Sequence, residues 1–342
     1  MNRRNFLLAG LVAAVGCRRE DASAAARLAE EEPAAAPAQQ PVPAPATAAA
    51  AAAQDYPILG INSHLLRPDD LRLVRDLGIT HVRSTIYTPL WAEVPSYQQT
   101  ARENTERAAD LGLKLMYVVH NAYGEVFRLP YDPGAARAFT RLAIDIISRL
   151  PRAESWQLWN EQDVWVQAPF GAGERPPQGA MRVGRNYGRW WLEAYAAIKD
   201  AHPQALLVTG GTADHEAERW RGFLRGMMET GIEADAIAVH AYGPWPESRQ
   251  IIAEAAAIVG DRAPLWVTEC GAKPGSHWSP AYQAEAWRST IRGNQREQLA
   301  ERLYPYSLET DPAHPAYGVR DVDGTPRPVL DWLHGRLELP EP

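Results

Sequence analysis

The sequence predicts a single (β/α)₈ barrel, and three observations support this fold class. Short apolar runs rich in β-branched residues alternate with longer amphipathic segments eight times between residues 55 and 342, which is typical of parallel strands joined by helices. The length of this region is that of one barrel domain. The competing fold is a doubly wound open sheet, which most commonly binds a nucleotide through a glycine-rich loop after its first strand. No such loop follows the first predicted strand here. The pair Gly210-Gly211 follows the fifth predicted strand, but alone it is weak evidence for such a loop.

Each repeat contributes one predicted strand and one predicted helix. The strands are expected at residues 58–61, 81–86, 114–119, 155–159, 206–209, 236–240, 265–268 and 303–308. The helices are expected at residues 68–77, 100–111, 134–150, 185–201, 218–230, 247–259, 280–292 and 328–334. Gly78, Gly112, Gly231 and Gly260 follow four of these helices, where left-handed C-caps are expected. Pro305 cannot donate a ladder hydrogen bond, so we expect a short or bulged eighth strand.

The N-terminal residues are predicted to lie outside the barrel. Arg3-Arg4 and the apolar run 7–15 are typical of a twin-arginine signal peptide over residues 1–17, because the run is too short to span a bilayer. Small residues before Cys17 resemble a bacterial lipoprotein cleavage site; the alternative is an ordinary cleaved signal in which Cys17 is incidental. Residues 18–54, rich in alanine and proline, predict a disordered linker. We therefore expect an exported protein, periplasmic or membrane-anchored, that contacts the membrane only through this anchor.

The net charge and the cysteine content limit the ligands and the chemistry that the sequence predicts. The net charge of −7 and the absence of a basic run argue against nucleic acid as a ligand. Cys17 and Cys270 are the only cysteines, so stability must come from the core if Cys17 is lipidated. Cys270 is expected to be a small buried residue rather than a catalytic thiol, because no histidine adjoins it in the sequence. No heptad or sticky repeat is present, so a monomer is the default expectation.

Two glutamates end predicted strands, Glu161 after the fourth and Glu269 after the seventh. The C-terminal ends of the strands form the active-site face of such a barrel. Two carboxylates that face each other there are the minimum equipment for cleaving a glycosidic bond.

Strand geometry predicts which way the side chains near these glutamates point. Alternation predicts that Val267 and Glu269 share the barrel interior and that Thr268 and Cys270 face the helices. The same rule places Asn160 on the face opposite to the glutamate that follows it. If both are needed in one site, the fourth strand must lose its regularity at its end.

Three motifs occur in order, each at the end of a predicted strand: Trp159-Asn160-Glu161, His240-Ala241-Tyr242 and Thr268-Glu269. Together they resemble the clan A glycoside hydrolases, retaining enzymes on (β/α)₈ barrels, and within the clan they are most similar to families 39 and 5. Residues 317–328 resemble the region before the last helix of these families. The resemblance implies that Glu161 is the general acid and then the base, and that Glu269 is the nucleophile. It implies no cofactor and a carbohydrate substrate.

The resemblance also implies roles for neighbouring residues. Asn160 would bond the sugar 2-hydroxyl, Tyr242 would donate to Glu269, and His240 would line the same subsite. Arg83, on the second predicted strand, would keep the pKa of Glu269 low, although it could instead pair with a loop carboxylate. Further sugar-binding candidates follow other strands: His64, His120, Asn121, Trp165, Trp245, Trp278 and Tyr306.

These further candidates have plain structural alternatives. A single histidine is often a satisfied strand-end residue, and a tryptophan often packs between helices, although aromatic faces also stack on sugar rings. Many clan A enzymes place a tryptophan at the end of strand eight. Here Tyr304 or Tyr306 takes that place, which leaves the geometry of the inner subsite open.

The sequence thus predicts an exported retaining β-glycosidase acting on a poly- or oligosaccharide, with two alternatives. The first is a carbohydrate-binding barrel lipoprotein without catalysis. The second is a divalent-metal enzyme with Glu161, Glu269, His240 and His120 as ligands; the residue types suit a metal, but no tight His-x-His spacing is present. A carboxyl separation of about 5–5.5 Å would favour the retaining enzyme.

Overall fold

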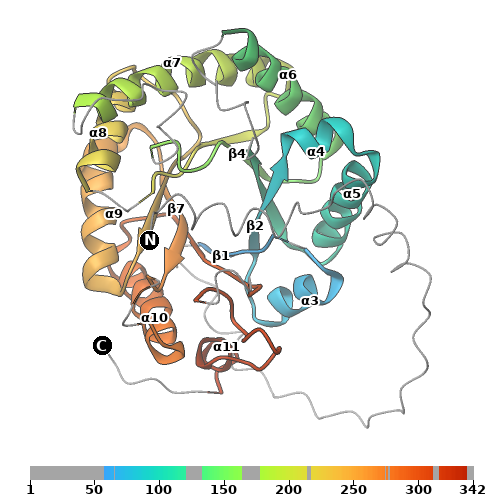
Figure 1. Cartoon of the computed structure of the whole chain (residues 1–342), viewed down its shortest axis with the longest axis vertical. Helices are drawn as coiled ribbons and strands as arrows, with labels where there is room; N and C mark the ends of the chain where they lie inside the picture. The colour runs from blue at the N-terminus through green and yellow to red at the C-terminus, as the bar shows by residue number, and fades with distance from the viewer. Residues whose placement is uncertain are drawn as a thin grey trace, which may run out of the picture.

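Eight parallel strands form one sheet that closes on itself, which confirms the predicted (β/α)₈ barrel. The computed structural model describes residues 58–64, 66–120, 133–163, 178–213, 217–273, 275, 278–310 and 316–336. The strands are ordered β5-β4-β3-β2-β1-β8-β7-β6. Isolated parallel bridges, Val208 with Ala236 and Thr212 with Val239, join β5 to β6. Figure 1 shows the helices as a ring around these strands. No helix within the described ranges is long and apolar enough to cross a membrane.

The observed strands begin close to the predicted ones, and most of them end further along the chain or at the same place. They are β1 (Ile58–Asn62), β2 (His81–Tyr87), β3 (Lys114–His120), β4 (Ser155–Leu158), β5 (Leu206–Thr209), β6 (Ile237–Tyr242), β7 (Leu265–Gly271) and β8 (Arg302–Pro305). The eighth strand is short, as Pro305 predicted. The signal peptide, Cys17 and the linker lie outside the described residues.

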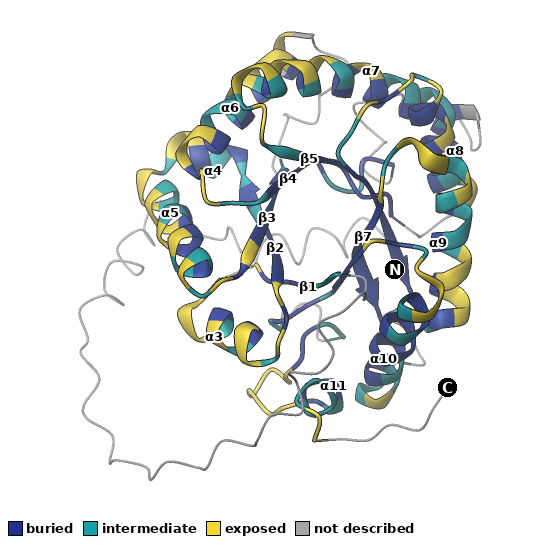
Figure 2. Cartoon of the chain, turned by 180° about the vertical axis from the view of Figure 1, so that it is seen from behind, coloured by how far each residue is buried: buried dark blue, intermediate teal, exposed yellow. Residues whose placement is uncertain are grey.

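The helices alternate with the strands, with one addition. They are α3 (Pro68–Asp76), α4 (Thr88–Glu93), α5 (Pro95–Asp110), α6 (Pro133–Arg149), α7 (Gln178–Ala201), α8 (Ala217–Met228), α9 (Trp245–Val259), α10 (Pro280–Glu297) and α11 (Pro328–Leu333), with a 3₁₀ turn, η4, at Gly260–Arg262. Helix α4 was not predicted, although Pro89 stands in its first turn, where proline is well tolerated. Figure 2 shows most of the strand residues in the buried colour, with exposed residues gathered on the helices.

Alternation of side chains divides the strands into an inner and an outer face. The outer face joins the helices in one large apolar core, and a smaller cluster fills the barrel interior: Met116, Val208, Ala236, Ala238, Trp266 and Tyr304. At the N-terminal end of the barrel, the Arg302 guanidinium lies 3.9 Å from the centroid of the Trp266 ring and 2.6 Å from Glu154. This end is therefore closed by packed and paired side chains, which leaves the chemistry to the opposite end.

Strand β7 contains a bulge just before Glu269. Val239 and Val267 are partners in the β6–β7 pair, but the next pair is His240 with Glu269, so Thr268 is the extra residue. The register with β8 shifts over the same stretch. Val267 belongs to the outer core, and a Cβ placed on Gly211 would overlap the Thr268 hydroxyl. The predicted faces of Val267 and Thr268 are therefore wrong, because the bulge, and not simple alternation, turns Glu269 inward. Cys270 lies in the outer core as expected.

Strand β4 loses its regularity at its end, as the Asn-Glu pair required. The strand stops at Leu158, and both Trp159 (φ 76°) and Glu161 (φ 46°) have left-handed backbone conformations. Such conformations are uncommon for residues other than glycine and persist only where the surroundings impose them. Trp159 is buried in the outer core. The backbone reversal brings Asn160 and Glu161 to one site.

Candidate active site

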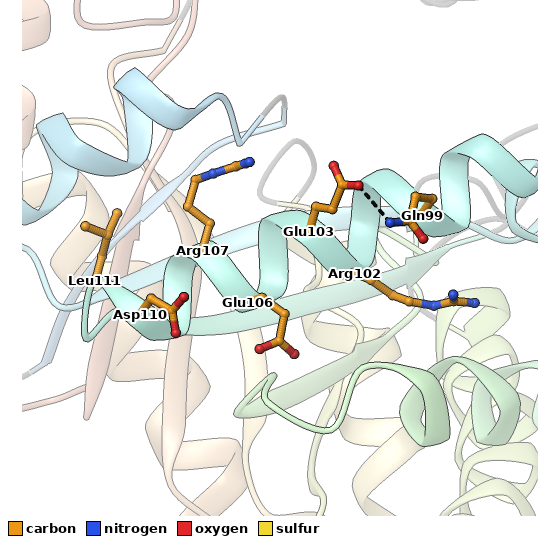
Figure 3. A pocket seen from close by; sticks show the side chains of 7 residues that line it. All are labelled: Gln99, Arg102, Glu103, Glu106, Arg107, Asp110 and Leu111. Atoms are coloured by element: carbon orange, nitrogen blue, oxygen red, sulfur yellow. Dashed lines mark hydrogen bonds between the residues drawn. The ribbon is translucent and has the colours of Figure 1, made fainter.

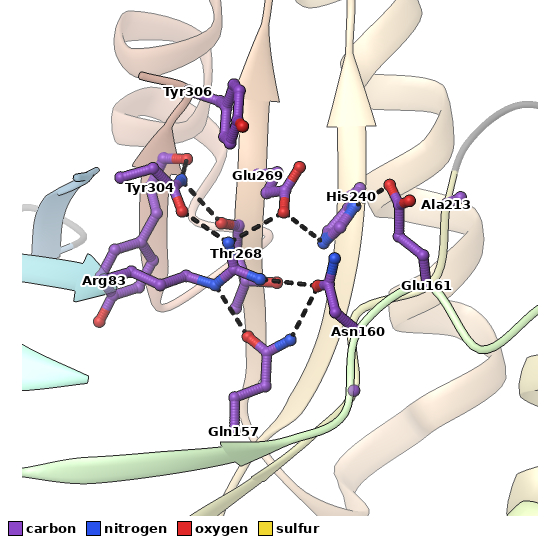
Figure 4. Close-up of polar contacts among 12 residues, drawn as sticks. Arg83, Gln157, Asn160, Glu161, Ala213, His240, Thr268, Glu269, Tyr304 and Tyr306 are labelled. Atoms are coloured by element: carbon purple, nitrogen blue, oxygen red, sulfur yellow. Dashed lines mark hydrogen bonds and ion pairs between the residues drawn. The ribbon is translucent and has the colours of Figure 1, made fainter. Parts of the chain in front are cut away.

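Arg83 is the centre of a buried polar network at the C-terminal end of the barrel (Figure 4). Its guanidinium donates from Nη1 to Glu269 Oε1 at 2.9 Å and from Nη2 to Asn160 Oδ1 at 2.7 Å. The Arg83 side chain is 3% exposed. The ion pair therefore lies in a medium where charge interactions are stronger than at the surface. This pairing decides against the alternative in which Arg83 binds a loop carboxylate.

Two amide side chains that sequence reasoning missed orient Arg83. Asn62 Oδ1 accepts from Nη1 at 2.6 Å and Gln157 Oε1 accepts from Nε at 2.9 Å. Asn62 Nδ2 also donates to the carbonyl of Thr268, in the β7 bulge, at 3.0 Å. Gln157 Nε2 donates to the Trp159 carbonyl at 3.0 Å, in the reversal after β4. Both residues point inward from β1 and β4. For Gln157 the available signal was the alternation of Ser155 and Gln157 with apolar residues in β4, whereas Asn62 stands alone as the polar residue of β1.

Glu269 is held in its ionised form. Tyr242 donates its hydroxyl to Oε2 at 2.8 Å, as the resemblance implied, and His240 Nε2 lies 3.5 Å from Oε1. Burial raises the pKa of Glu269, but the charges of His240 and Arg83, with the hydrogen bonds from Tyr242 and Arg83, outweigh burial and hold that pKa below its usual range. A carboxylate in this state is available to attack an electrophilic carbon.

His240 lies between the two glutamates. Its Nδ1 is 3.1 Å from Glu161 Oε1, and one oxygen of Glu161, one oxygen of Glu269 and a ring nitrogen of His240 all lie within 4.8 Å of one another. Burial lowers the pKa of His240, but the carboxylates of Glu269 and Glu161 outweigh burial and raise that pKa. The Glu161 side chain is 21% exposed. Glu161 is thus the glutamate that solvent can reach.

A third carboxyl group, Asp163, lies beside this pair and was missed by sequence reasoning. It is 1% exposed, and its Oδ1 accepts from the backbone N–H of Ala213 at 2.9 Å. Burial raises the pKa of Asp163 to about 7, and the charge of Glu161 adds to this effect. The acidic residue directly after Asn160-Glu161-Gln162 was the only sequence signal.

The two histidines predicted near the sugar have different surroundings. His64 is exposed, and its Nε2 is 2.8 Å from the Tyr306 hydroxyl. The His120 ring lies edge-on to Trp159, and burial together with the charge of Arg83 lowers the pKa of His120 to about 4. His120 is therefore neutral, and its Nε2 has no partner within the described residues. Both positions remain candidates for sugar hydroxyls.

Aromatic rings gather beside Glu269 on the β8 side. The Tyr306 ring lies 4.9 Å from the Tyr317 ring, nearly perpendicular to it, and the Tyr317 ring lies 6.0 Å from that of Tyr242. Tyr304 points into the barrel interior instead, so of the two tyrosines at the end of strand eight it is Tyr306 that faces this group of rings. Tyr317 is the residue of this group that sequence reasoning did not assign to the site.

One of the predicted tryptophans lies elsewhere, the role of Trp278 at the sugar stays a prediction, and two candidates lie outside the described residues. Trp245 begins α9, and its indole donates to Glu297 at 3.2 Å and packs on Gly293 of α10. Its placement corrects the prediction, because the same strand-to-helix position suits a helix-packing aromatic residue. The Arg327 guanidinium lies 5.0 Å from the centroid of the Trp278 ring. Asn121 and Trp165 lie outside the described residues.

A shallow surface hollow lies along α5, away from this network (Figure 3). The residues that line it are mostly charged: Gln99, Arg102, Glu103, Glu106, Arg107, Asp110 and Leu111. None of them belongs to the network around Arg83, and opposite charges on one exposed helix face are typical of a solvated surface. We assign no function to it.

Glu161, His240 and Glu269 are also the group of described residues that could hold a metal ion. His120, the fourth ligand of the metal alternative, is not part of this group. The buried guanidinium of Arg83 already neutralises Glu269 at 2.9 Å. A divalent cation at the same carboxylate would be repelled by that fixed charge.

Comparison with known proteins supports the fold. No protein-family model and no curated protein matches the sequence. Among solved structures, the β-glycosidase BGL167 superposes with a TM-score of 0.58 at 16% identity over 80% of this chain and 87% of that one. An exo-β-1,4-mannosidase from Opitutaceae bacterium strain TAV5 has a TM-score of 0.59 at 15% identity and covers 82% of this chain and 59% of that one.

A third solved structure matches over nearly its whole length. Cellulose synthase subunit Z from Clostridioides difficile has a TM-score of 0.58 at 14% identity, covering 82% of this chain and 99% of that one. Identities at this level show a shared fold and no more. The chain therefore shares its (β/α)₈ barrel fold with these structures, among them a β-glycosidase and a mannosidase.

Proposed function

We propose that this protein is a retaining β-glycosidase with Glu269 as nucleophile and Glu161 as general acid and base. The observation that carries the proposal is the asymmetry of the two glutamates. Glu269 is 7% exposed and receives hydrogen bonds from Arg83 and Tyr242. Among the described residues, the Glu161 side chain contacts only His240, and it reaches solvent. One group is thereby kept ionised, and the other lies open to solvent.

The separation of the carboxylates favours retention over inversion. Oxygens of the two groups approach within 4.8 Å. Retaining enzymes have carboxyl groups about 5–5.5 Å apart, and inverting enzymes leave roughly 6.5–9.5 Å for a water molecule. The shorter gap leaves room for the anomeric carbon against Glu269 and for the glycosidic oxygen against Glu161.

The reaction would proceed by two displacements. A Glu269 oxygen attacks the anomeric carbon while Glu161 gives its proton to the leaving oxygen, which breaks the glycosidic bond and forms a glycosyl ester. Glu161, now a carboxylate, takes a proton from water, and that water attacks the same carbon and releases Glu269. Between the two displacements, while Glu161 is ionised, the His240 ring donates a hydrogen bond from Nδ1 to the Glu161 carboxylate.

The resting network prepares the first displacement. Arg83 binds Glu269 and the side-chain oxygen of Asn160 together. Among the described residues the side-chain N–H₂ of Asn160 is then left to bond a sugar hydroxyl. A bond to the 2-hydroxyl strengthens as the oxocarbenium-like state develops. The proposed substrate is thus a β-linked sugar with a hydroxyl at this position.

A covalent label tests the assignment directly. The protein is incubated with a panel of 2-deoxy-2-fluoro β-glycosides bearing dinitrophenyl leaving groups and is analysed by mass spectrometry. We expect one adduct, mapped to Glu269, in the wild type and in Glu161→Ala, and none in Glu269→Ala. An adduct on another residue would contradict the assignment, and a folded protein that neither labels nor hydrolyses any glycoside would favour the non-catalytic binding alternative.

A metal-dependent activity is the second candidate, favoured by the grouping of Glu161, His240 and Glu269. Hydrolysis that is abolished by EDTA and restored by one divalent ion, with bound metal found by elemental analysis, would support it. Because Arg83 already occupies Glu269, we expect activity to withstand EDTA.

We further propose that the protein is exported and anchored through Cys17. The proposal rests on Arg3-Arg4, the short apolar run and the small residues before Cys17. Metabolic labelling with a fatty acid should mark the wild type, and Cys17→Ala should lose the label and leave the membrane fraction. Unchanged labelling of Cys17→Ala would contradict the anchor.

A further inference from the structure

The Gly210-Gly211 pair belongs to a segment that lies between the two members of the Glu161–His240 pair. Residues 210–213, which follow β5 and which we name the β5 extension, bond to both sides. The Glu161 N–H donates to the Gly211 carbonyl at 2.8 Å. On the other side, the His240 N–H donates to the Thr212 carbonyl at 2.9 Å. The backbones of the two residues are therefore bonded to consecutive carbonyls of one short segment.

Side chains lock the β5 extension to the turn that carries Glu161. Asp163 Oδ1 accepts from the Ala213 N–H at 2.9 Å, and Gln162 Nε2 donates to the Gly210 carbonyl at 2.9 Å. The two side chains belong to residues that are 1% and 0% exposed. Figure 4 shows Ala213 next to Glu161 on this side of the network. Residues 161–163 are thus attached at three successive positions.

A fourth contact comes from the helical layer. The Tyr187 hydroxyl, from α7, donates to the Leu158 carbonyl at 2.9 Å and accepts from the Gly210 N–H at 2.8 Å. It joins the last residue of β4 to the first residue of the β5 extension. Tyr187 is 1% exposed, so no solvent competes for these bonds.

The backbone of Glu161 requires such support. Its φ of 46° is left-handed, and for a non-glycine residue this conformation is unfavourable and persists only where the surroundings impose it. The same close approach favours glycine at both positions, because a Cβ on Gly210 would displace the Gln162 amide and one on Gly211 would overlap His240 and Thr268. This explains a sequence feature that the phosphate-loop interpretation left unused.

We propose that Asp163 is a positioning residue that, through its bond to Ala213 in the β5 extension, holds the Glu161 carboxyl against His240. Its partners in this task are Gln162 and Tyr187. The role rests on the proposed function of Glu161 as the acid. Asp163 itself does not touch the substrate in this arrangement; it acts through the 161–163 turn.

The dependence on the leaving group tests the role. A misplaced acid slows only those substrates whose leaving group needs a proton. We expect Asp163→Ala to lower kcat/KM about tenfold or more for a methyl or methylumbelliferyl glycoside and by less than about threefold for the dinitrophenyl glycoside of the same sugar. Asp163→Asn keeps an oxygen that can accept from Ala213, so it should restore most of the loss. A general loss of packing would slow all substrates alike.

A structural readout keeps this inference separate from the proposed function. In crystal structures of Asp163→Ala and of Tyr187→Phe, we expect the Glu161 carboxyl to move away from His240 by about 1 Å or more, whether or not the wild type cleaves any sugar tested. Asp163→Asn should keep the wild-type separation of 3.1 Å. An unmoved Glu161 in Asp163→Ala, or equal loss on all leaving groups, or no recovery in Asp163→Asn, would overturn the proposal. If the wild type hydrolyses no glycoside, the proposed function fails, and the crystal structures still decide this one.

Discussion

Arg83 donates to Glu269 at 2.9 Å across the barrel, from β2 to β7, with both side chains almost completely buried. The same guanidinium binds Asn160, so it connects the strand end of the proposed acid with that of the proposed nucleophile. The side-chain oxygens of Asn62 and Gln157 accept hydrogen bonds from the guanidinium and so fix its orientation. The fork geometry of arginine suits such multiple contacts, whereas an ammonium group is a point charge.

Replacing Arg83 with lysine should therefore impair chemistry. The lysine would keep a positive charge but could not bond Glu269, Asn160 and both amides together, so we expect kcat/KM to fall about 10²–10³-fold, chiefly in kcat. Steady-state kinetics measure the effect. Arg72→Lys, on the exposed face of α3, is the matched control and should be unchanged. A loss in Arg83→Lys that appears only in KM would contradict a role in the transition state.

Tyr242→Phe removes the hydroxyl that donates to Glu269 Oε2. That bond is one of the contributions that lower the pKa of Glu269, so the pKa should rise in the variant. Since the nucleophile must be ionised, activity that is lost as the pH falls should be lost at a higher pH than in the wild type. We also expect kcat to fall about tenfold, the size expected for one hydrogen bond to a charged group. Steady-state kinetics at a series of pH values, which give both kcat and kcat/KM, measure both effects, and an acid limb of kcat/KM that stays in place would contradict the assignment.

Glu154 should make the barrel sensitive to acid. Burial raises the pKa of Glu154, but His81, whose Nε2 lies 3.6 Å from the carboxylate, and the hydrogen-bonded charge of Arg302 outweigh burial and lower that pKa from 4.5 to about 2. A carboxyl group whose pKa is lower in the folded than in the unfolded protein stabilises the fold at any pH above its unfolded-state pKa. That stability disappears as the pH falls from about 4.5 towards 2. Glu154→Gln should lose about 2 kcal/mol of unfolding free energy near neutral pH.

Chemical denaturation at several pH values tests this prediction. The difference between wild type and Glu154→Gln should shrink as the pH is lowered through that window, because the wild-type carboxyl becomes protonated. Glu106→Gln, on the exposed face of α5, serves as the control and should differ little from the wild type. A difference that is constant with pH would show that Glu154 acts through packing alone.

Cys270 should be inert in the folded protein. It is 1% exposed, and burial together with the charge of Glu269 raises the pKa of the Cys270 thiol. Iodoacetamide should not modify it until the protein is unfolded, as peptide mapping would reveal. Cys270→Ala should keep near-normal activity. Rapid alkylation of Cys270 with loss of activity in the native protein would favour the thiol interpretation set aside above.

Much of the fold and of the site could be predicted because the signals are local. Short apolar runs alternate with amphipathic ones, and glutamates stand at the ends of two strands. Because the active site of a barrel lies at the C-terminal ends of its strands, these glutamates predict where the site is. Arg83, His240 and Tyr242 lie where the prediction placed them, in contact with Glu269. The required irregularity after β4 is also present.

The failures share one cause, which is that a local pattern does not report what a side chain meets. Val267 was assigned to the interior because alternation ignores the register of β6 and β8, which creates the bulge at Thr268. Trp245 follows a strand like a site residue but packs on Gly293 of another helix. Asn62 carried no motif, because its partners are up to 243 residues away.

The sequence by itself determined the barrel, the order of its strands along the chain and the place where each strand begins to within a residue, since these depend on neighbours within one or two turns. The tertiary structure decided which of those residues meet: the bulge that turns Glu269 inward, the amides that fix Arg83, and the β5 extension that holds Glu161 against His240. These contacts arise only when the sheet closes, because the groups that must be hydrogen-bonded there come from strands far apart in the chain.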